Sequence, residues 1–241
     1  MTVIAFAGPS LTAADRSAHP LVDWRGPAEA GDMLRLRASA GTVICLIDGY
    51  FDHRPAVRHK ELLLLLSRGI AVLGASSIGA LRAAEMDSFG MVGVGAIYRA
   101  YAGSRLCGDD EVALVHAPQR WNWKALSLPL VDCRANLHQA LRARILSSQE
   151  ARTTLQAAKA IHYTDRDWPS VLAATCIAST RQQAILEWIE AHGVSQKRLD
   201  ALACLDVAAP GLTTRPVPPM VRTSLVAALA RECGLALEEL Y

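Results

Sequence analysis

The stretch from Gly69 to Gly95, G-I-A-V-L-G-A-S-S-I-G-A-L-R-A-A-E-M-D-S-F-G-M-V-G-V-G, constrains the fold more than any other part of the sequence. Its first apolar run, Ile70–Leu73, is typical of a parallel strand that is covered on both faces. A Gly-Ala pair then breaks the strand pattern, and either Ser76 or Ser77 can cap the helix that the following residues favour. The stretch therefore predicts a buried strand, a tight turn and a helix.

Other segments repeat this pattern. Val3–Ala7 is an apolar run that ends in the turn G-P-S-L, and Thr42–Ile47 is a β-branched run that ends in D-G. We expect a helix from about Ala56 to Ser67, so that residues 42–73 form a strand, a helix and a second strand, as in a right-handed parallel crossover. A further strand is expected at Val112–His116.

The chain changes character after Leu128, where helical patterns replace apolar strands. We expect helices over Asn136–Ile145, from a capping box at Ser147 through Ile161, from Trp168 onward, and over Val221–Cys233 after a Pro-rich connector, Pro210–Pro219. A brief helix opened by Pro27 is expected near the N-terminus. The predicted fold class is α/β, with a Rossmann-like parallel-sheet core in residues 1–130 and a mainly helical region, residues 131–241, packed on it.

Composition excludes several classes of function. The 25 basic and 23 acidic side chains nearly balance, which gives no electrostatic basis for binding nucleic acid or an anionic membrane. The leucine run 62–66 is too short to cross a bilayer. The six cysteines form no C-x-x-C pair and fit reduced thiols in the cytoplasm better than disulfides or zinc ligands. We expect no metal and no cofactor.

Candidate site residues gather where the predicted strands end. In parallel α/β units, ligands bind outside the carboxyl ends of the strands, and the loops Gly8–Leu11, Asp48–Pro55 and Gly74–Gly79 all fall there. Ser77 lies on such a turn, where N–H groups at the start of a helix can stabilise a developing oxyanion. The simpler interpretation is that this serine only caps the helix.

Lys60 is the first candidate for a general base, since it lies near the start of the helix after Pro55. The partial positive charge at that helix end favours a neutral amine, which can accept a proton from a serine hydroxyl. The alternative is an exposed lysine neutralised in part by Glu61. His53 and His59 are rival bases in the same segment.

Further polar side chains can line the same crevice. Arg82 and Glu85 are spaced i, i+3 and are most simply an ion pair, while Asp109 and Asp110 belong to an acidic triplet that is either a solvated loop or a site for a cation or basic partner. The turn G-A-S-S-I-G lacks the spacing and the lysine of a P-loop, so a phosphate site there has little support. The side chains that we expect as crevice lining are Ser10, Asp48, His53, Arg82, Glu85, Asp109 and Asp110.

Several motifs, in the same order along the chain, resemble the TfuA-like family. They are G-P-S-L, D-G-Y-F, V-R-H-K-E-L, G-A-S-S-I-G-A-L-R-A-A-E, G-M-V-G-V-G-A-I-Y and D-D-E-V-A, which cover most of residues 3–116. The last third is similar to the family only in P-L-V-D-C-R and H-Y-T-D-R-D-W. Ile78 stands where the family usually has methionine, a substitution that conserves volume.

The resemblance implies a partner of a YcaO-type ATP-dependent enzyme in the formation of peptide backbone thioamides. Such a protein hydrolyses the C-terminal thiocarboxylate of a ThiS-like sulfur carrier and releases sulfide. By motif, the nucleophile is Ser77 and the base is Lys60, with neighbouring Ser76 left open as the alternative nucleophile. The oxyanion site would then be formed by N–H groups near Ser77 and Ile78, supported by Ser76 and Gly79.

Two other functions remain open. The chain could be a non-catalytic adaptor that binds the YcaO-type enzyme and improves its hold on the precursor peptide, with the helices of the last third as the interface. Alternatively, sulfur could pass through a persulfide on Cys107, which lies in a polar, Gly-rich segment.

Overall fold

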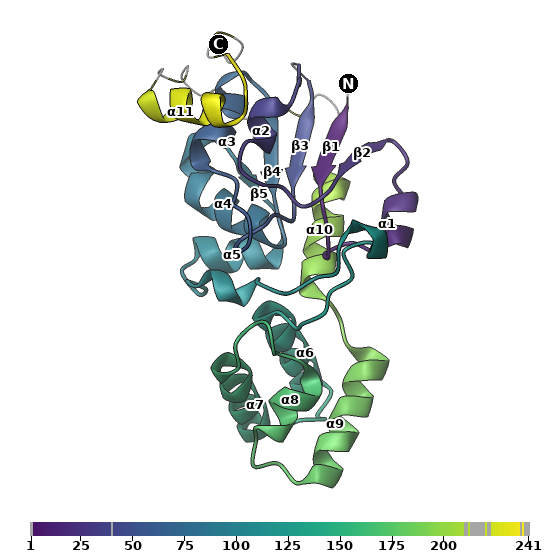
Figure 1. Cartoon of the computed structure of the whole chain (residues 1–241). Helices are drawn as coiled ribbons and strands as arrows, with labels where there is room; N and C mark the ends of the chain where they lie inside the picture. The colour runs from purple at the N-terminus through teal and green to yellow at the C-terminus, as the bar shows by residue number, and fades with distance from the viewer. Residues whose placement is uncertain are drawn as a thin grey trace. The chain divides into compact units, whose positions relative to one another are not determined.

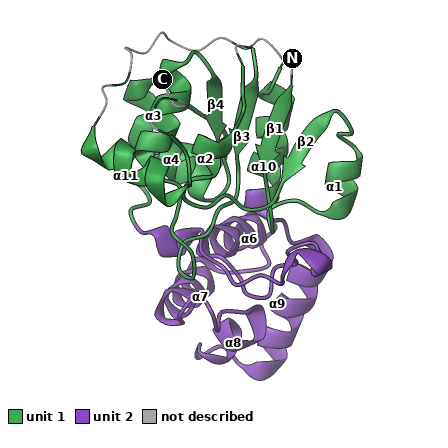
Figure 2. Ribbon diagram, turned by 45° about the horizontal axis from the view of Figure 1, so that its top comes forward, with its two compact units in different colours: residues 1–107, 198–241 green, residues 108–197 purple. Residues whose placement is uncertain are grey.

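The computed structural model describes residues 2–39, 41–209 and 223–236, together with residues 212, 220 and 238. The chain forms two compact units, which Figure 2 shows in different colours. The first unit combines Met1–Cys107 with Arg198–Tyr241, and the second is Gly108–Lys197. The first unit is thus built from two segments that are far apart in the sequence.

The first unit contains a five-stranded sheet in the order β2-β1-β3-β4-β5, and every neighbouring pair of strands is parallel. The strands are β1 (Val3–Phe6), β2 (Val22–Arg25), β3 (Val43–Leu46), β4 (Ala71–Gly74) and β5 (Val92–Gly93). The strand order reverses between β1 and β3, as it does in doubly wound α/β folds. The predicted Rossmann-like α/β class is confirmed.

The helices of the first unit are short, and most of them follow a strand (Figure 1). They are α1 (Ala13–Ser17), α2 (Asp32–Arg35), α3 (His59–Ser67), α4 (Ile78–Met86), the 3₁₀ helix η1 (Asp87–Phe89), α5 (Gly95–Ala102), α10 (Gln196–Val207, whose first two residues belong to the second unit) and α11 (Ser224–Glu232). In the part of the chain that the structure describes, no helix combines the length and the apolar composition needed to cross a membrane.

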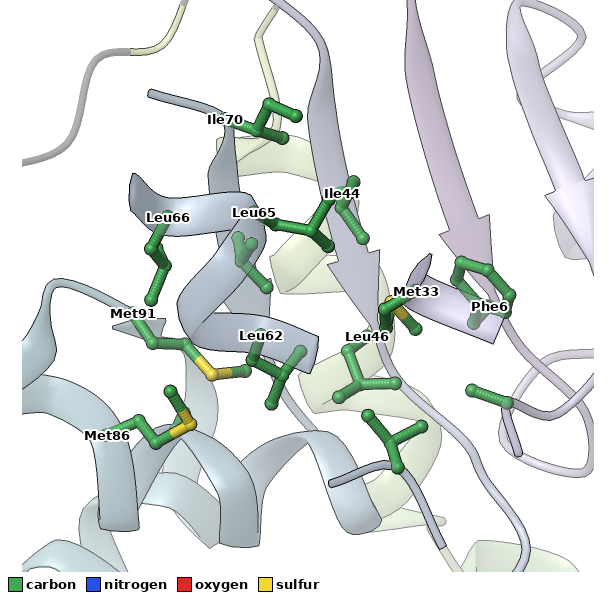
Figure 3. Packing of buried hydrophobic residues seen from close by; sticks show 14 of the residues in the cluster. Phe6, Met33, Ile44, Leu46, Leu62, Leu65, Leu66, Ile70, Met86 and Met91 are labelled. Carbon is green, nitrogen blue, oxygen red and sulfur yellow. The ribbon is translucent and has the colours of Figure 1, made fainter. Parts of the chain in front are cut away.

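One face of the sheet packs on α2, α3 and α4 (Figure 3). Alternate residues of β3, Ile44 and Leu46, meet Leu62 and Leu65 of α3 there, with Met33 of α2 beside them. Successive side chains of a strand point to opposite faces, so these residues form a single layer. This layer explains why α3 needs its run of leucines.

The other face of the sheet packs on α10, a helix that follows β5 by roughly 100 residues. Ala5, Cys45 and Leu73 lie on this face against Ala201 and Cys204 of α10. In Figure 1, α10 lies on the side of the sheet away from α3 and α4. Because both faces are covered, the central strands carry almost no polar side chains.

Two local expectations in the first unit are wrong. Pro27 does not open a helix, because Ala28 continues in a parallel bridge with Gly49, donating its N–H to Asp48 O at 2.9 Å. The next helix, α2, follows Gly31, whose φ is +90°. Helix α3 begins at His59, three residues later than Ala56, because Arg58 before it has an extended backbone.

The second unit is helical. Its elements are the 3₁₀ helices η2 (Asp109–Glu111) and η3 (Gln119–Trp121) and the helices α6 (Leu130–Arg142), α7 (Ser148–Ala160), α8 (Trp168–Ala173) and α9 (Ser179–His192). The predicted capping box is present at Ser147, which accepts from Glu150 N and donates its own N–H to that carboxylate. Leu137, Leu172 and Ile185 come from three of these helices and share one core.

The strand expected at Val112–His116 is absent. After η2 the chain is irregular, and His116 makes a single antiparallel bridge with Ala125. Val112 and Ala113 are buried within a helical unit, whose described residues include no strand with which this segment could form a ladder. Short apolar runs occur in buried irregular segments as well as in strands, and periodicity alone does not separate the two.

The C-terminal helix α11 is described from Ser224 to Glu232 and packs on the outer side of α2 and α3 through Leu34, Leu64, Val226 and Leu229. The expected helix start at Val221 lies outside the described residues. The same holds for the Pro-rich connector, Pro210–Pro219, apart from residue 212.

Candidate functional site

The candidate site lies at the carboxyl edge of the sheet, beside the reversal of strand order between β1 and β3. Residues 8–10 follow β1, Asp48 follows β3, and Ser76 and Ser77 follow β4. In doubly wound sheets this edge is where ligands bind, because the chain leaves the two central strands in opposite directions.

Asp48 is buried, and its carboxylate fills the turn after β1. Oδ2 accepts the backbone N–H of Gly8 at 2.8 Å and of Ser10 at 2.9 Å, and Oδ1 accepts the Ser10 hydroxyl at 2.7 Å. Backbone donors of such a turn can bind an external anion in other α/β proteins. Here the anion that they bind is a side chain of the same unit.

Arg16 of α1 lies close to this turn, and no sequence pattern marks it as a site residue. Its guanidinium donates to Ala7 O at 3.1 Å and Gly8 O at 2.9 Å. Burial lowers the pKa of Arg16, while the charge of Asp48 acts to raise it. The arginine thus offsets part of the negative charge of Asp48. Its position nine residues after the predicted strand Val3–Ala7 gave no signal, because isolated arginines are usually surface residues.

Ser76 adopts a left-handed backbone with φ +66°, and its side chain is buried. Its Oγ lies 2.7 Å from Ser10 Oγ, so Ser76, Ser10 and Asp48 form a continuous chain of hydrogen bonds. A positive φ costs a residue with a Cβ roughly 1 kcal/mol or more. These bonds help to hold Ser76 in that conformation.

Ser77 occupies the N-cap position of α4 but does not cap it by a side-chain hydrogen bond, so the simple capping interpretation is wrong. Its N–H donates to Ala75 O at 2.8 Å and Ile47 O at 3.3 Å, and Gly79 N–H also reaches Ile47 O, at 3.4 Å. The N–H of Ile78 has no acceptor among the described residues. Of the three donors expected near the oxyanion, Ile78 N–H is the one that remains available.

Gly79 is required by close packing. A Cβ at this position would lie 1.7 Å from Leu46 O and 2.6 Å from Leu46 C, which no side chain could tolerate. The backbone of the first turn of α4 therefore packs directly against the end of β3. This contact fixes the position of Ser77 relative to the sheet edge. Glycine here has a steric cause that the sequence alone did not reveal.

Lys60 is the second residue of α3 and is half-buried. Glu61 does not pair with it, because the Glu61 carboxylate turns inward and accepts from Gly31 N at 2.7 Å and Arg58 N at 3.1 Å. Within the described chain, the Lys60 ammonium has no hydrogen bond or ion pair, with Ser77 or with any other residue. The Ser77 and Lys60 pair stays a prediction, since catalytic hydrogen bonds are often formed only with substrate bound.

Arg82 and Glu85 form the expected i, i+3 ion pair at 2.7 Å, and Glu85 also contacts His59 Nε2 at 2.8 Å. Arg82 Nε donates in addition to Val57 O at 2.9 Å, which ties α4 to the segment before α3. His59 is therefore engaged with a carboxylate, while His53 lies exposed in the loop before α3. Neither histidine is hydrogen-bonded to a serine of the site.

Asp109 and Asp110 belong to the second unit, where they are exposed in η2. The third carboxylate of the triplet, Glu111, is buried and makes a two-pronged bond with Arg134 at 2.6 and 2.8 Å. Glu111 thus holds η2 against α6. No cluster of three or more His, Cys, Asp or Glu side chains suited to a metal ion occurs in the described ranges.

Comparison with known proteins gives one family match. A family model described as TfuA-like protein matches residues 48–167, about half of the chain. The match begins at Asp48 and includes Lys60, Ser76 and Ser77, whereas Ser10 lies before it. No curated protein matches the chain.

Proposed function

This chain belongs to the TfuA-like family, and from that premise we propose that it is the partner of a YcaO-type ATP-dependent enzyme in the formation of peptide thioamides. In this role it hydrolyses the C-terminal thiocarboxylate of a ThiS-like sulfur carrier and supplies the sulfide. The proposal combines what the family resemblance implies with the chemistry that the sheet edge can perform.

The observation that carries the proposal is the turn between β4 and α4. Ser77 lies at the first turn of α4, and the adjacent Ile78 N–H has no acceptor among the described residues. A hydroxyl next to an unused backbone donor at a helix start suits acyl transfer, because the donor can bind the oxygen that becomes negative. The positive end of the α4 dipole adds to this effect.

Lys60 is the proposed base. It lies in the first turn of α3, where the helix dipole disfavours a positive charge, and its amine has no bonded partner within the described chain. An amine that is not committed to a carboxylate can move toward a serine when substrate binds. His59, by contrast, is already engaged with Glu85.

The reaction proceeds in two steps. Ser77 Oγ bonds to the thiocarboxylate carbon while its proton passes to the Lys60 amine. The C–S bond then breaks as Lys60 returns that proton to the departing sulfur, which releases hydrosulfide, leaves an ester and makes the amine neutral again. Water attacks the ester, giving its proton to Lys60, and the ester C–O bond breaks so that Ser77 recovers its proton and the carrier leaves as a carboxylate. No electrons are transferred, and no cofactor is needed.

The test measures sulfide released from a thiocarboxylated carrier by the purified full chain. We expect Ser77→Ala and Lys60→Ala to lower the rate by about 1,000-fold or more, as losses of a nucleophile or base do. Matched controls are Ser67→Ala at the end of α3 and Lys159→Ala on the exposed face of α7, which should keep the wild-type rate. Circular dichroism establishes that each variant is folded.

Two outcomes would redirect the proposal. Wild-type rates in both Ser77→Ala and Lys60→Ala would exclude this hydrolysis. If the wild type released no sulfide yet bound the YcaO-type enzyme and improved its affinity for the precursor peptide, the non-catalytic adaptor would be the correct function.

A further inference from the structure

The hydrogen bonds around Asp48 have a fixed direction. Oδ2 of this carboxylate accepts two backbone N–H groups, and Oδ1 accepts the only proton that Ser10 Oγ carries. Ser10 therefore has no proton left for Ser76, and the 2.7 Å contact between the two hydroxyls must be a bond in which Ser76 donates. The order of donors is Ser76, then Ser10, then Asp48.

In this order the Ser76 hydroxyl donates its proton to Ser10 Oγ. Its proton lies between the two hydroxyl oxygens, in a buried position. Moving that proton along the chain would bring it to a carboxylate on which three donors already converge. This chain of hydrogen bonds is therefore suited to hold Ser76 in place and poorly suited to remove the proton of its hydroxyl.

The backbone supplies a second, independent observation. Ser76 has φ +66°, while Ser77 has φ −112° and ψ −125°, so the chain turns sharply between β4 and α4. Holding a residue with a Cβ at positive φ requires surrounding contacts that favour it. The hydrogen bonds from Ser76 through Ser10 to Asp48 provide such contacts from two neighbouring strands.

We propose that Ser10 and Asp48 are positioning residues that lock Ser76 in the left-handed turn, and that this turn presents Ser77 as the nucleophile beside Ile78 N–H. The inference rests on the proposed hydrolysis and assigns the attack to Ser77 rather than to Ser76. It assigns roles to Ser10 and Asp48 that do not require either side chain to touch the substrate.

The rival assignment makes Ser76 the nucleophile. Strained serines on strand-to-helix turns are nucleophiles in α/β-hydrolases, and the positive φ belongs to Ser76. In that case Asp48 would act as the base through Ser10. The two assignments predict opposite results for glycine at position 76, because glycine adopts positive φ without strain but has no hydroxyl.

The first experiment compares Ser76→Gly with Ser76→Ala by rates of sulfide release from a thiocarboxylated carrier. We expect Ser76→Gly to keep activity within about tenfold of wild type, and Ser76→Ala to have the lower kcat because it retains the strain without the hydrogen bond. KM should change little in both, since neither side chain touches the substrate. Loss of all activity in Ser76→Gly, with the fold intact, overturns the proposal.

The second experiment uses Ser10→Ala and Asp48→Asn. Each should lower kcat by about tenfold and leave the pH dependence of kcat as in the wild type, because no proton passes to Asp48. A shifted pH profile in Asp48→Asn would establish the relay and overturn the positioning role. Should Asp48→Asn fail to fold, Ser10→Ala gives the same comparison.

Labelling identifies the nucleophile directly. A serine-reactive fluorophosphonate is added to the full chain, and the tryptic peptide of residues 69–82, which contains both serines, is sequenced by mass spectrometry. Label on Ser77 is expected, and label on Ser76 overturns the inference while the hydrolase function survives. No sulfide release and no label in the wild type would instead remove the proposed function, and the nucleophile assignment with it.

Discussion

Glu61 shows how one buried side chain can serve two segments at once. Its two oxygens accept N–H groups of Gly31 and Arg58, so it joins the start of α3 to the turn before α2. Burial raises the pKa of Glu61 to about 7, although hydrogen bonds from the N–H groups of Arg58, Gly31 and Met33 act to lower it. The sequence suggested Glu61 as a partner of Lys60, since adjacency along the chain says nothing about which way a side chain turns.

We predict that Glu61 makes stability depend on pH in a defined window. Below the ordinary pKa of about 4.5 the group is protonated in both states, and between 4.5 and 7 the folded state binds more protons than the unfolded state. The contribution of protonated Glu61 to the free energy of unfolding is therefore lost as pH rises through about 7. The free energy of unfolding of Glu61→Gln minus that of wild type should grow between pH 5 and 8, by up to ~3 kcal/mol.

Urea unfolding at pH 5, 6, 7 and 8 measures this difference. Asp32, whose pKa is also raised by burial, lies close to Glu61 and is present in both proteins, so its effect largely cancels. Glu190→Gln, on an exposed position of α9, is the control and should follow the wild-type curve. A constant difference across the pH range would contradict the prediction.

Most residues of the candidate site could be found from sequence, with Arg16 as the exception, but the bonds between them could not. Ser10, Asp48 and Ser76 were expected at one sheet edge, because each follows an apolar run. Their hydrogen bonds depend on β1 and β3 being neighbours, and on the positive φ of Ser76, which serine rarely adopts. No local pattern in the sequence encodes either fact.

Among the elements, α10 shows how long-range packing escapes local prediction. Its sequence predicts a helix, yet nothing in it says that the helix covers the face of a sheet formed by residues 3–75. The adjacent helices α2, α3 and α4 all pack on the opposite face. The strand expected at Val112–His116 failed for a related reason, because a strand needs a partner that a short sequence window does not contain.

We predict that α10 tolerates a charge on one side only. Leu205 is 7% exposed and packs on the sheet, so Leu205→Asp would bury a carboxylate without a partner and lower the free energy of unfolding by about 3 kcal/mol or more. Leu199, on the same helix, is 47% exposed, and Leu199→Asp should change stability by less than about 1 kcal/mol. Urea unfolding compares the two, and equal losses would show that α10 does not cover the sheet as described.

For the molecule as a whole, the α/β class and the helical nature of residues 128–207 followed from sequence patterns. The expected domain boundary near residue 130 stays a prediction, and the structure divides the described chain into the compact units 1–107 with 198–241, and 108–197. A unit made of two distant segments has no signature in composition, since each segment alone looks like an ordinary part of an α/β protein.

The exposure of the cysteine thiols can be used to test the packing of each unit. Cys107 and Cys176 are exposed, while Cys45 and Cys204 are buried in the first unit and Cys133 in the second. Burial raises the pKa of Cys133 to about 12, and a hydrogen bond with Cys45 together with burial raises that of Cys204. Because thiolates are the reactive form, we predict that Cys107 and Cys176 react fast with Ellman's reagent and that the three buried thiols react only on unfolding.

Mass spectrometry after brief labelling checks this assignment, and the double change Cys107→Ser with Cys176→Ser should remove the fast phase. Fast labelling of Cys45 or Cys133 would contradict the burial described. The Cys107→Ser variant also tests sulfur relay, because unchanged thioamide formation in that variant would exclude a persulfide at this position.

The two-segment construction of the first unit has a consequence for synthesis on the ribosome. Residues 1–107 emerge with all five strands, but the helix that covers Ala5, Cys45 and Leu73 follows only after the second unit has been made. At typical rates of about 5–20 residues per second, that apolar face stays open for roughly 5–20 s. During this interval the nascent chain presents a bare sheet face to its surroundings, and a chaperone that shields it should raise the yield of folded protein.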